Sequence, residues 1–97
     1  INPQGFPMIL TGDFNINPDN PALEYLNAEM ESARDVAEKS DWHNTFNGWS
    51  TIKTDRIIDY IYFKGFDKCT EYQTIIKQYL NIPFVSDHYP IYAILKF

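Results

Sequence analysis

Cysteine is scarce in this 97-residue sequence, which contains only Cys69. A single cysteine cannot form an internal disulfide or supply the ligands of a cysteine-rich zinc module, so we expect Cys69 to be a small buried residue. Long apolar runs are also missing, because no stretch approaches the ~20 residues of a membrane-spanning helix. The sequence starts at Ile1 without a basic-then-apolar signal segment, and a start without methionine leaves open what precedes it.

Basic charge is in short supply, because 8 lysines and arginines stand against 13 aspartates and glutamates, for a formal net charge of -5. This balance disfavours a protein that coats nucleic acid non-specifically, since such a protein needs a basic surface. It does not exclude an enzyme that acts on a phosphoester. Carboxylates that collect a divalent cation also count as negative charge, and the bound ion reverses the local sign.

Apolar residues are plentiful. Hydrophobic types make up 44% of the sequence and aromatic types 16%, which is enough to build a packed core. The length suits one small domain unit, and no internal repeat, low-complexity tract or linker-like composition divides it. We therefore treat residues 1–97 as a single unit.

The first part of the chain predicts a strand, a turn and a helix. Pro7–Leu10 is a short apolar run bounded by glycines, which predicts a strand buried on both faces. After the N-P-D-N-P turn, Asn20 suits the N-cap and Pro21 the first helical position, so we expect a helix over about 21–31. Its apolar face consists of Leu23, Leu26 and Met30.

The middle of the chain is more ambiguous. Residues 32–40 either extend that helix, form a second short helix or form a loop. Residues 41–54 are rich in Asn, Gly, Ser and Thr but carry three large aromatic residues, Trp42, Phe46 and Trp49. Such residues either pin a polar loop to the core or line a cleft. Pinning is the more common outcome, since large aromatic side chains are mostly buried.

The last part of the chain predicts three strands. Ile57–Phe63 is apolar on both faces, which is typical of a central strand. Residues 69–78 alternate more weakly, as a half-exposed strand does, and Ile91–Phe97 is the third strand. Strands outnumber helices and show no regular β-α-β alternation. The predicted fold class is therefore layered α/β, with mixed or antiparallel strands and one or two helices.

Polar side chains cluster at three places along these apolar strands. The clusters are Asp13 with Asn15, Asp59 alone, and Asp87 with His88. Asp59 shares a strand face with apolar residues, where a carboxylate is costly unless it is hydrogen-bonded or charge-paired. It either ties down a loop, pairs with the preceding Arg56, or belongs to a functional site. His88 lies at the mouth of the last strand, a position where functional residues concentrate.

The ligand types disfavour zinc. His43 has no acidic neighbour closer than Asp41, so we expect a structural or surface role for it. Two histidines, one cysteine and scattered aspartates do not have zinc-ligand spacing. A hard, oxygen-ligated ion such as Mg²⁺ or Mn²⁺ suits the carboxylates better.

Three motifs then occur in a recognisable order: T-G-D-F-N at 11–15, R-I-I-D-Y-I at 56–61 and S-D-H-Y-P-I at 86–91. Their combination resembles the endonuclease/exonuclease/phosphatase family, which includes pancreatic deoxyribonuclease, apurinic endonucleases, sphingomyelinases, inositol-phosphate 5-phosphatases and deadenylases. Each motif alone is weak, but three in the family's order form a strong signal. T-F-N-G-W at 45–49 is a softer match to bacterial members. The resemblance implies a deoxyribonuclease-like α/β sandwich and a Mg²⁺- or Mn²⁺-dependent phosphodiesterase, nuclease or phosphatase.

The resemblance also assigns roles. Asp13 would orient or deprotonate the attacking water, and Asn15 would hydrogen-bond a phosphate oxygen. His88 would stabilise charge on a non-bridging phosphoryl oxygen, and Asp59 would accept a hydrogen bond from its other ring nitrogen. Asp87 would help to hold the divalent ion, which clamps the phosphate.

The resemblance covers nearly the whole chain but only the second half of the family domain. The upstream Asn, metal-binding Glu and second catalytic His are absent, so we expect 1–97 to be a C-terminal half-domain that is inactive alone. Its partner would be the N-terminal half, or a second copy that covers the exposed sheet. The phosphoester substrate stays open between nucleic acid, lipid and sugar phosphate, with Asn15 and Trp49 as candidate contacts. The alternative is a non-catalytic half-domain that acts as a binding or oligomerisation module.

Overall fold

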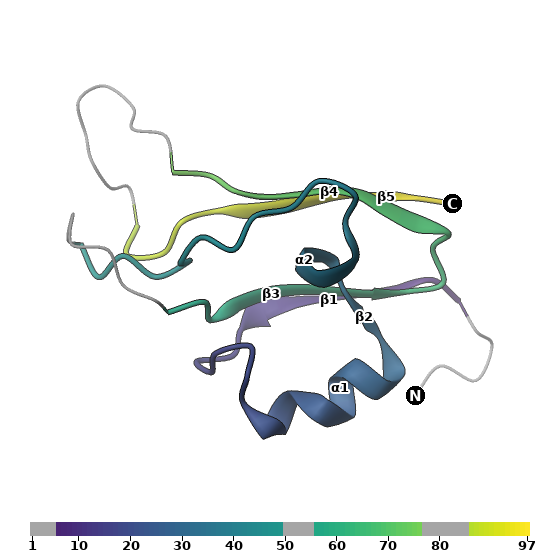
Figure 1. Ribbon diagram of the computed structural model, residues 1–97, viewed down its shortest axis with the longest axis horizontal. Coiled ribbons are helices and arrows are strands. Elements are labelled where there is room, and N and C mark those ends of the chain that lie inside the picture. Colours follow the sequence, from purple (N-terminus) through teal and green to yellow (C-terminus); the bar gives the residue numbers. More distant parts are fainter. Residues whose placement is uncertain (1–5, 50–55, 77–85) are drawn as a thin grey trace.

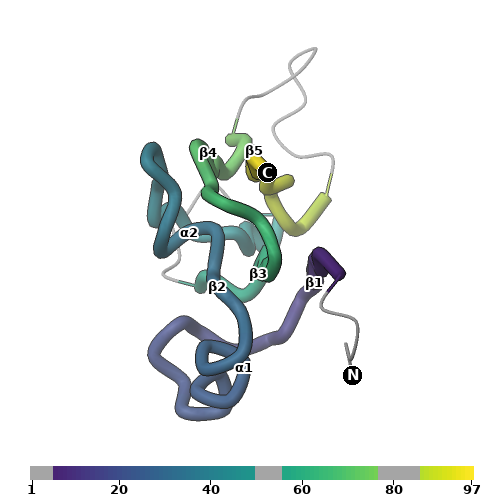
Figure 2. The backbone as a smooth tube through the Cα atoms, turned by 90° about the vertical axis from the view of Figure 1, so that its right-hand side faces the viewer, coloured from purple at the N-terminus to yellow at the C-terminus, as the bar shows by residue number. Residues whose placement is uncertain are grey.

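The computed structural model describes residues 6–49, 56–76 and 86–97 (Figure 1). The elements in chain order are β1 (Met8–Asp13), the 3-10 turn η1 (Pro21–Leu23), α1 (Glu24–Glu29), β2 (Glu31–Ser32), α2 (Ala33–Val36), β3 (Asp59–Lys64), β4 (Lys68–Thr74) and β5 (Ile91–Lys96). They form two antiparallel sheets, with strand orders β1-β3-β2 and β4-β5. The sheets lie in separate layers, and α1 lies beyond the first sheet (Figures 1 and 2). The predicted layered α/β fold class is confirmed.

Strand β3 is central in its sheet, as predicted, and both of its faces are covered. Tyr60 and Tyr62 pack against Leu23 on the side of α1. On the opposite face, Phe63 packs in a second cluster, whose other buried members are Ala33 of α2 and Cys69 and Tyr72 of β4. Because side chains alternate along a strand, Asp59 lies on the same face as Phe63, toward the β4–β5 sheet. Cys69 is 2% exposed, which confirms it as a buried core residue.

The helix prediction is largely confirmed. The Asn20 side chain accepts a hydrogen bond from the Ala22 backbone N at 2.9 Å, and Pro21 opens the first turn. Helix α1 ends at Glu29, two residues before the predicted end, because Glu31 and Ser32 pair with β3 as strand β2. Of the alternatives for residues 32–40, the second short helix is the one observed, as α2.

The predicted burial of the first strand is wrong. Strand β1 extends to Asp13, and its side chains are mostly exposed, with Ile9 at 57% and Leu10 at 40%. The physical reason is its place in the sheet. It pairs with β3 and is an edge strand of the described three-stranded sheet, so its other edge has no strand neighbour among the described residues.

The prediction that the aromatic residues pin the 41–54 loop is also wrong for both tryptophans. Trp42 is 58% exposed and Trp49 62%, while Phe46 is only partly buried. The loop is held instead by buried polar side chains, namely Asn44, Thr45 and Asn47. Thr45 accepts from backbone amides of the β3 segment and Asn47 donates to the Ser86 carbonyl, while Asn44 donates to the Phe46 carbonyl within the loop. A tryptophan has one N–H and no acceptor, so it could not accept as Thr45 does. Residues 50–54 of the predicted loop lie outside the described residues.

The remaining strands are close to their predicted positions. Strand β4 begins one residue earlier than predicted and ends at Thr74, and residues 77–78 of that prediction lie outside the described residues. Strand β5 ends one residue before the predicted Phe97. Within the described part of the chain, no helix has the length and apolar character needed to cross a membrane.

Candidate active site

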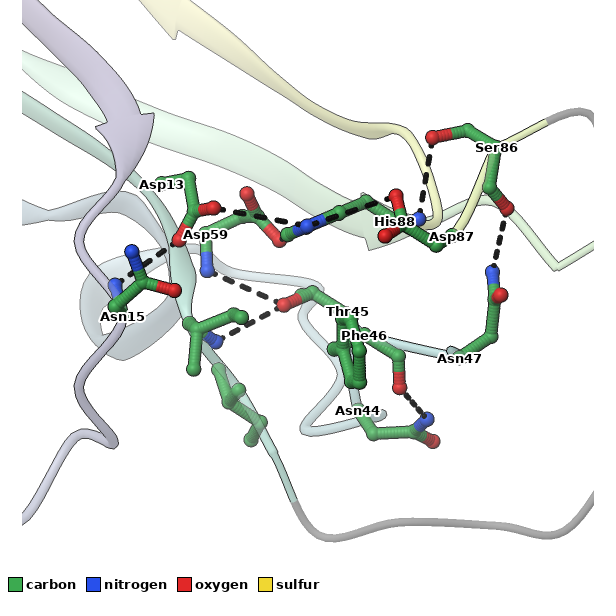
Figure 3. A network of polar contacts seen from close by, with 12 residues as sticks. Asp13, Asn15, Asn44, Thr45, Phe46, Asn47, Asp59, Ser86, Asp87 and His88 are labelled. Carbon is green, nitrogen blue, oxygen red and sulfur yellow. Dashed lines mark hydrogen bonds and ion pairs between the residues drawn. The ribbon is translucent and has the colours of Figure 1, made fainter. Parts of the chain in front are cut away.

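The side chains of two aspartates and one histidine meet where the ends of separate strands converge (Figure 3). Asp13 ends β1 and Asp59 begins β3, and the two residues are register partners in the antiparallel ladder. His88 precedes β5 and reaches the same point. One ligand atom from each of these side chains lies within 4.8 Å of the other two. The fold therefore brings together residues that are up to 75 positions apart in the sequence.

One ring nitrogen of the His88 imidazole is hydrogen-bonded to Asp59, and the other faces two further carboxylates. Its Nδ1 donates to Asp59 Oδ2 at 2.7 Å, and both side chains are largely shielded from solvent. Its Nε2 lies 3.6 Å from Asp13 Oδ2 and 3.9 Å from Asp87 Oδ1. The hydrogen bond to Asp59 raises the pKa of His88 against the opposing effect of burial, and the charges of the three aspartates raise it further. This environment favours the imidazolium form.

The turn after β1 explains the spacing of Asp13 and Asn15. Asp13 Oδ1 accepts a hydrogen bond from the Asn15 backbone N at 3.0 Å, and Asn15 has φ 58°, a left-handed conformation that asparagine tolerates better than most residues. Between them, Phe14 N donates to Ile58 O at 2.8 Å. The Phe14 ring stacks on Tyr60 with centroids 5.1 Å apart. The central residue of D-F-N is thus anchored, while the two polar side chains face solvent.

Thr45 connects the two sides of the site from beneath. It is fully buried, and its hydroxyl accepts hydrogen bonds from the backbone N atoms of Ile58 and Asp59 at 3.0 and 3.2 Å. Its backbone carbonyl accepts a hydrogen bond from Tyr89 N at 2.7 Å. Figure 3 shows Thr45 between the Asp59 and His88 segments.

Arg34 supports Asp59 from the opposite side. Its guanidinium Nη2 donates to the backbone carbonyl of Asp59 at 2.9 Å and to the Tyr72 hydroxyl at 2.7 Å. The residue is 3% exposed. The Asp59 backbone is therefore held at its carbonyl by Arg34 and at its amide by Thr45.

The other predicted residues take different positions. Arg56 does not pair with Asp59 through an ion pair in the described structure, and its Cζ lies 5.0 Å over the Phe46 ring instead. His43 has the expected structural setting, with Nδ1 bonded to the Asn44 carbonyl at 2.8 Å and an edge-on contact to Tyr89. Trp49 has φ 62°, and its backbone N donates to Asn47 Oδ1 at 2.7 Å.

Residues 1–88 match the model of the Endonuclease/Exonuclease/phosphatase family. The chain belongs to this family. No curated protein matches the sequence. Among solved structures, a mannosyl-6-phosphatase from Bacteroides thetaiotaomicron matches with a TM-score of 0.86 and 22% identity, over 98% of this chain and 39% of that chain. A conserved protein of unknown function from Enterococcus faecalis gives a TM-score of 0.79 and 25% identity, over 93% of this chain and 36% of that one.

These likenesses confirm the endonuclease/exonuclease/phosphatase fold, and the chain spans less than two fifths of each of these structures. Motif reasoning found the side chains at the centre of the site but missed Thr45 and Arg34, which support them. Thr45 carried a signal, because it begins the T-F-N-G-W stretch that resembles bacterial family members. Arg34 carried none, since an arginine within A-R-D-V reads as a solvent-exposed helical residue.

Proposed function

We propose that this chain carries part of the active centre of a divalent-metal-dependent phosphoester hydrolase that works by in-line attack of water on phosphorus. One observation carries the proposal. Asp13, Asp59 and His88, drawn from three separate segments, converge with ligand atoms within 4.8 Å of one another. Membership of a family named for nucleases and phosphatases supports the same reaction class.

The geometry around His88 suits charge stabilisation at phosphorus. With Nδ1 donating to Asp59, the protonated ring has its Nε2–H free to donate to a non-bridging phosphoryl oxygen. The raised pKa of His88 favours the imidazolium, whose charge would offset the negative charge that grows on that oxygen as water attacks. Asp59 then acts through His88 by fixing the tautomer and orientation of the ring.

Asp13 and Asn15 suit the water and the phosphate. Asp13 Oδ1 is occupied by the Asn15 amide, so Oδ2 is the oxygen that can accept a proton from the attacking water. The new bond joins the water oxygen to phosphorus while the ester oxygen leaves with its electron pair. The Asn15 side chain, which is exposed beside Asp13, would donate its amide N–H to a phosphate oxygen.

The donor set fits a hard divalent cation. The Nδ1 of His88 and Oδ2 of Asp59 are engaged with each other, and Oδ2 of Asp13 is assigned to the attacking water, so of the exposed carboxylates of Asp13 and Asp87 it is Asp87 that is left to bind an ion directly. Their side chains are 39% and 44% exposed, so they are accessible to an ion and its water ligands. Asp87 would hold Mg²⁺ or Mn²⁺, with Asp13 beside it. When bound, the ion supplies Lewis-acid neutralisation of phosphate charge.

The substrate is a phosphoester of nucleic acid, lipid or sugar phosphate. The exposed Trp49 ring supports a stacking contact with a base or sugar, because its backbone is held in a left-handed conformation next to the 86–88 segment. A structurally similar protein is described as a mannosyl-6-phosphatase, which makes sugar phosphates one of the substrate classes to test.

Residues 1–97 are proposed to form the C-terminal half of a larger domain. Exposed apolar side chains on β1 and β5, among them Ile9, Leu10 and Ile94, support a covering partner. That partner would be the N-terminal half of the domain or a second copy. The same exposure favours the alternative function, a non-catalytic module for binding or oligomerisation. Gel filtration with a Mg²⁺ titration separates the two. A monomer that binds Mg²⁺ weakly favours the half-enzyme, and a stable dimer indifferent to metal favours the module.

The test of the proposed function uses the full-length protein and a panel of nucleic acids, phosphoinositides, sphingomyelin, mannose 6-phosphate and simple phosphate esters. His88→Ala and Asp13→Asn are each expected to lower kcat by about 10²–10³-fold while the fold stays intact, because each removes an electrostatic group aimed at the reacting phosphate. His43→Ala is the matched control, since His43 packs outside the cluster. Near-normal Mg²⁺-dependent hydrolysis by the His88 or Asp13 variant would refute the assignment.

A further inference from the structure

A short segment, residues 45–48, in which Thr45 and Asn47 are buried, joins the strand that carries Asp59 to the segment that carries His88. On one side, Thr45 N donates to Arg56 O at 3.0 Å, and the Thr45 hydroxyl accepts from the amides of Ile58 and Asp59. On the other side, Tyr89 N donates to the Thr45 carbonyl at 2.7 Å. A single residue thus contacts the backbone of Asp59 and the backbone next to His88.

The rest of the 45–48 segment strengthens the second side. The backbone N atoms of Asn47 and Gly48 donate to the Asp87 carbonyl at 2.8 and 3.2 Å. The Asn47 side chain donates to the Ser86 carbonyl at 3.0 Å, and Phe46 pairs with His88 as an isolated antiparallel bridge. Figure 3 shows the Asn47 side chain directed at the Ser86 carbonyl. The residues around His88 are therefore held by this segment at several successive positions.

The burial pattern indicates that these contacts are specific. Thr45 is 0% exposed and Asn47 2%, whereas the neighbouring Trp49 is 62% exposed. Burying a hydroxyl and an amide is unfavourable unless their hydrogen bonds are made, so such groups persist where they fix a geometry. An apolar residue at position 45 would fill the same space but would leave two buried amides, those of Ile58 and Asp59, without this acceptor.

We propose that Thr45 is a positioning residue that sets Asp59 against His88. Its hydroxyl fixes the first residue of β3, its carbonyl fixes the segment before β5, and together they align Asp59 Oδ2 with His88 Nδ1 at 2.7 Å. The effect of Thr45 on catalysis rests on the proposed function, whereas the alignment of Asp59 with His88 is a property of the fold. The hydroxyl is the decisive group, because it is the part of Thr45 that reaches the Asp59 amide.

The experiment compares Thr45→Val, which has the same shape without the hydroxyl, with Thr45→Ser, which keeps it, in the full-length protein. The structural readout is the NMR resonance of the His88 Nδ1–H proton, which moves downfield when the proton is hydrogen-bonded to a carboxylate. Thr45→Val should move this resonance upfield or broaden it beyond detection, while Thr45→Ser should leave it in place. The kinetic readout is hydrolysis of bis-p-nitrophenyl phosphate and p-nitrophenyl phosphate in Mg²⁺.

For Thr45→Val, kcat should fall by about 10- to 100-fold with KM nearly unchanged, because a small misplacement of a group that acts in the transition state has effects of this size. Thr45→Ser should restore kcat to near the wild-type value. If Thr45→Val does not fold, as judged by circular dichroism, Thr45→Cys replaces it, since a thiol keeps the volume and is a weak acceptor. An unmoved resonance and an unchanged kcat in a folded Val or Cys variant would overturn the proposal, and so would equal losses in the Ser variant.

The two readouts separate this proposal from the proposed function. If the wild-type protein hydrolyses neither ester and binds no Mg²⁺, but Thr45→Val still moves the Nδ1–H resonance, the positioning role stands and the hydrolase assignment fails. If the wild-type protein is active and the resonance does not respond to Thr45, the reverse holds.

Discussion

Replacing Arg34 by methionine should destabilise the protein by about 2–4 kcal/mol. The guanidinium is 3% exposed, and it donates to the Asp59 carbonyl at 2.9 Å and to the Tyr72 hydroxyl at 2.7 Å. Its Cζ also lies 4.9 Å from the ring centroid of Tyr72, 5.2 Å from that of Tyr60 and 5.6 Å from that of Trp42. Aromatic faces and two oxygens thus stabilise this cation, and no carboxylate among residues 6–49, 56–76 and 86–97 forms an ion pair with it.

The magnitude follows from these contacts. A hydrogen bond from a charged donor contributes about 1.5–3 kcal/mol, so losing two costs about 3–6 kcal/mol. Part of this is recovered, because Arg34 Nε is buried without a hydrogen-bond partner among the described residues, a penalty of about 1–3 kcal/mol that methionine removes. Methionine also fills the vacated space with a flexible apolar chain. These two ranges leave a loss of about 0–5 kcal/mol, and the lost contacts of the cation with the aromatic rings add to it, so we expect a net loss of about 2–4 kcal/mol.

The assay is urea unfolding of the full-length protein at neutral pH, with the slope m checked for constancy. Arg34→Lys is the control. It keeps the charge but offers a point charge in place of the planar fork, so an intermediate loss is expected. Turnover should fall as well, since the Asp59 backbone loses one of its two side-chain supports. A loss below about 0.5 kcal/mol for Arg34→Met, the range of neutral surface substitutions, would refute this reasoning.

Three further outcomes are expected. The pKa of His88 is raised chiefly by the Asp59 hydrogen bond, so activity that needs the cation is present at low pH and is lost as pH rises through that pKa. Asp59→Asn should therefore shift the pH at which activity falls to a lower value. An unchanged pH profile of activity would contradict this prediction. Burial raises the pKa of Tyr60 to about 12 from 10.0, so stability should decline by about 2 kcal/mol as pH rises from 10 to 12. Tyr60→Phe should flatten that decline in unfolding measurements, and an equally steep decline would exclude Tyr60 as its source. Gly65 has φ 85°, and a Cβ there would lie 2.9 Å from Pro7 Cα. Gly65→Ala should therefore lower stability by about 1–2 kcal/mol, measured by thermal unfolding. An unchanged melting temperature would argue against strain at this turn.

Local chemistry made much of the fold predictable. Asn20 and Pro21 define a helix start through their own cap and dihedral preferences, and the apolar residues on both faces of I-I-D-Y-I-Y-F indicate a strand covered on both sides. Exposure was harder to predict. The run at β1 is as apolar as a central strand, but whether Ile9 is covered depends on which neighbour packs there. The exposure of Trp42 and Trp49 was also harder to predict, because buried polar side chains hold their loop and leave both rings largely exposed.

The sequence by itself determined which groups are the candidates for the proposed chemistry. The order of the three motifs, through its resemblance to the endonuclease/exonuclease/phosphatase family, selected Asp13, Asn15, Asp59, Asp87 and His88 as candidates, and the cost of a carboxylate on an apolar strand face pointed separately to Asp59. Only the tertiary structure decided how they meet. The 2.7 Å bond between His88 and Asp59, and the contacts of Thr45 and Arg34 that hold Asp59 in place, join residues far apart in the chain. Such contacts are set by the packing of the strands that bring them together, and no local pattern records them.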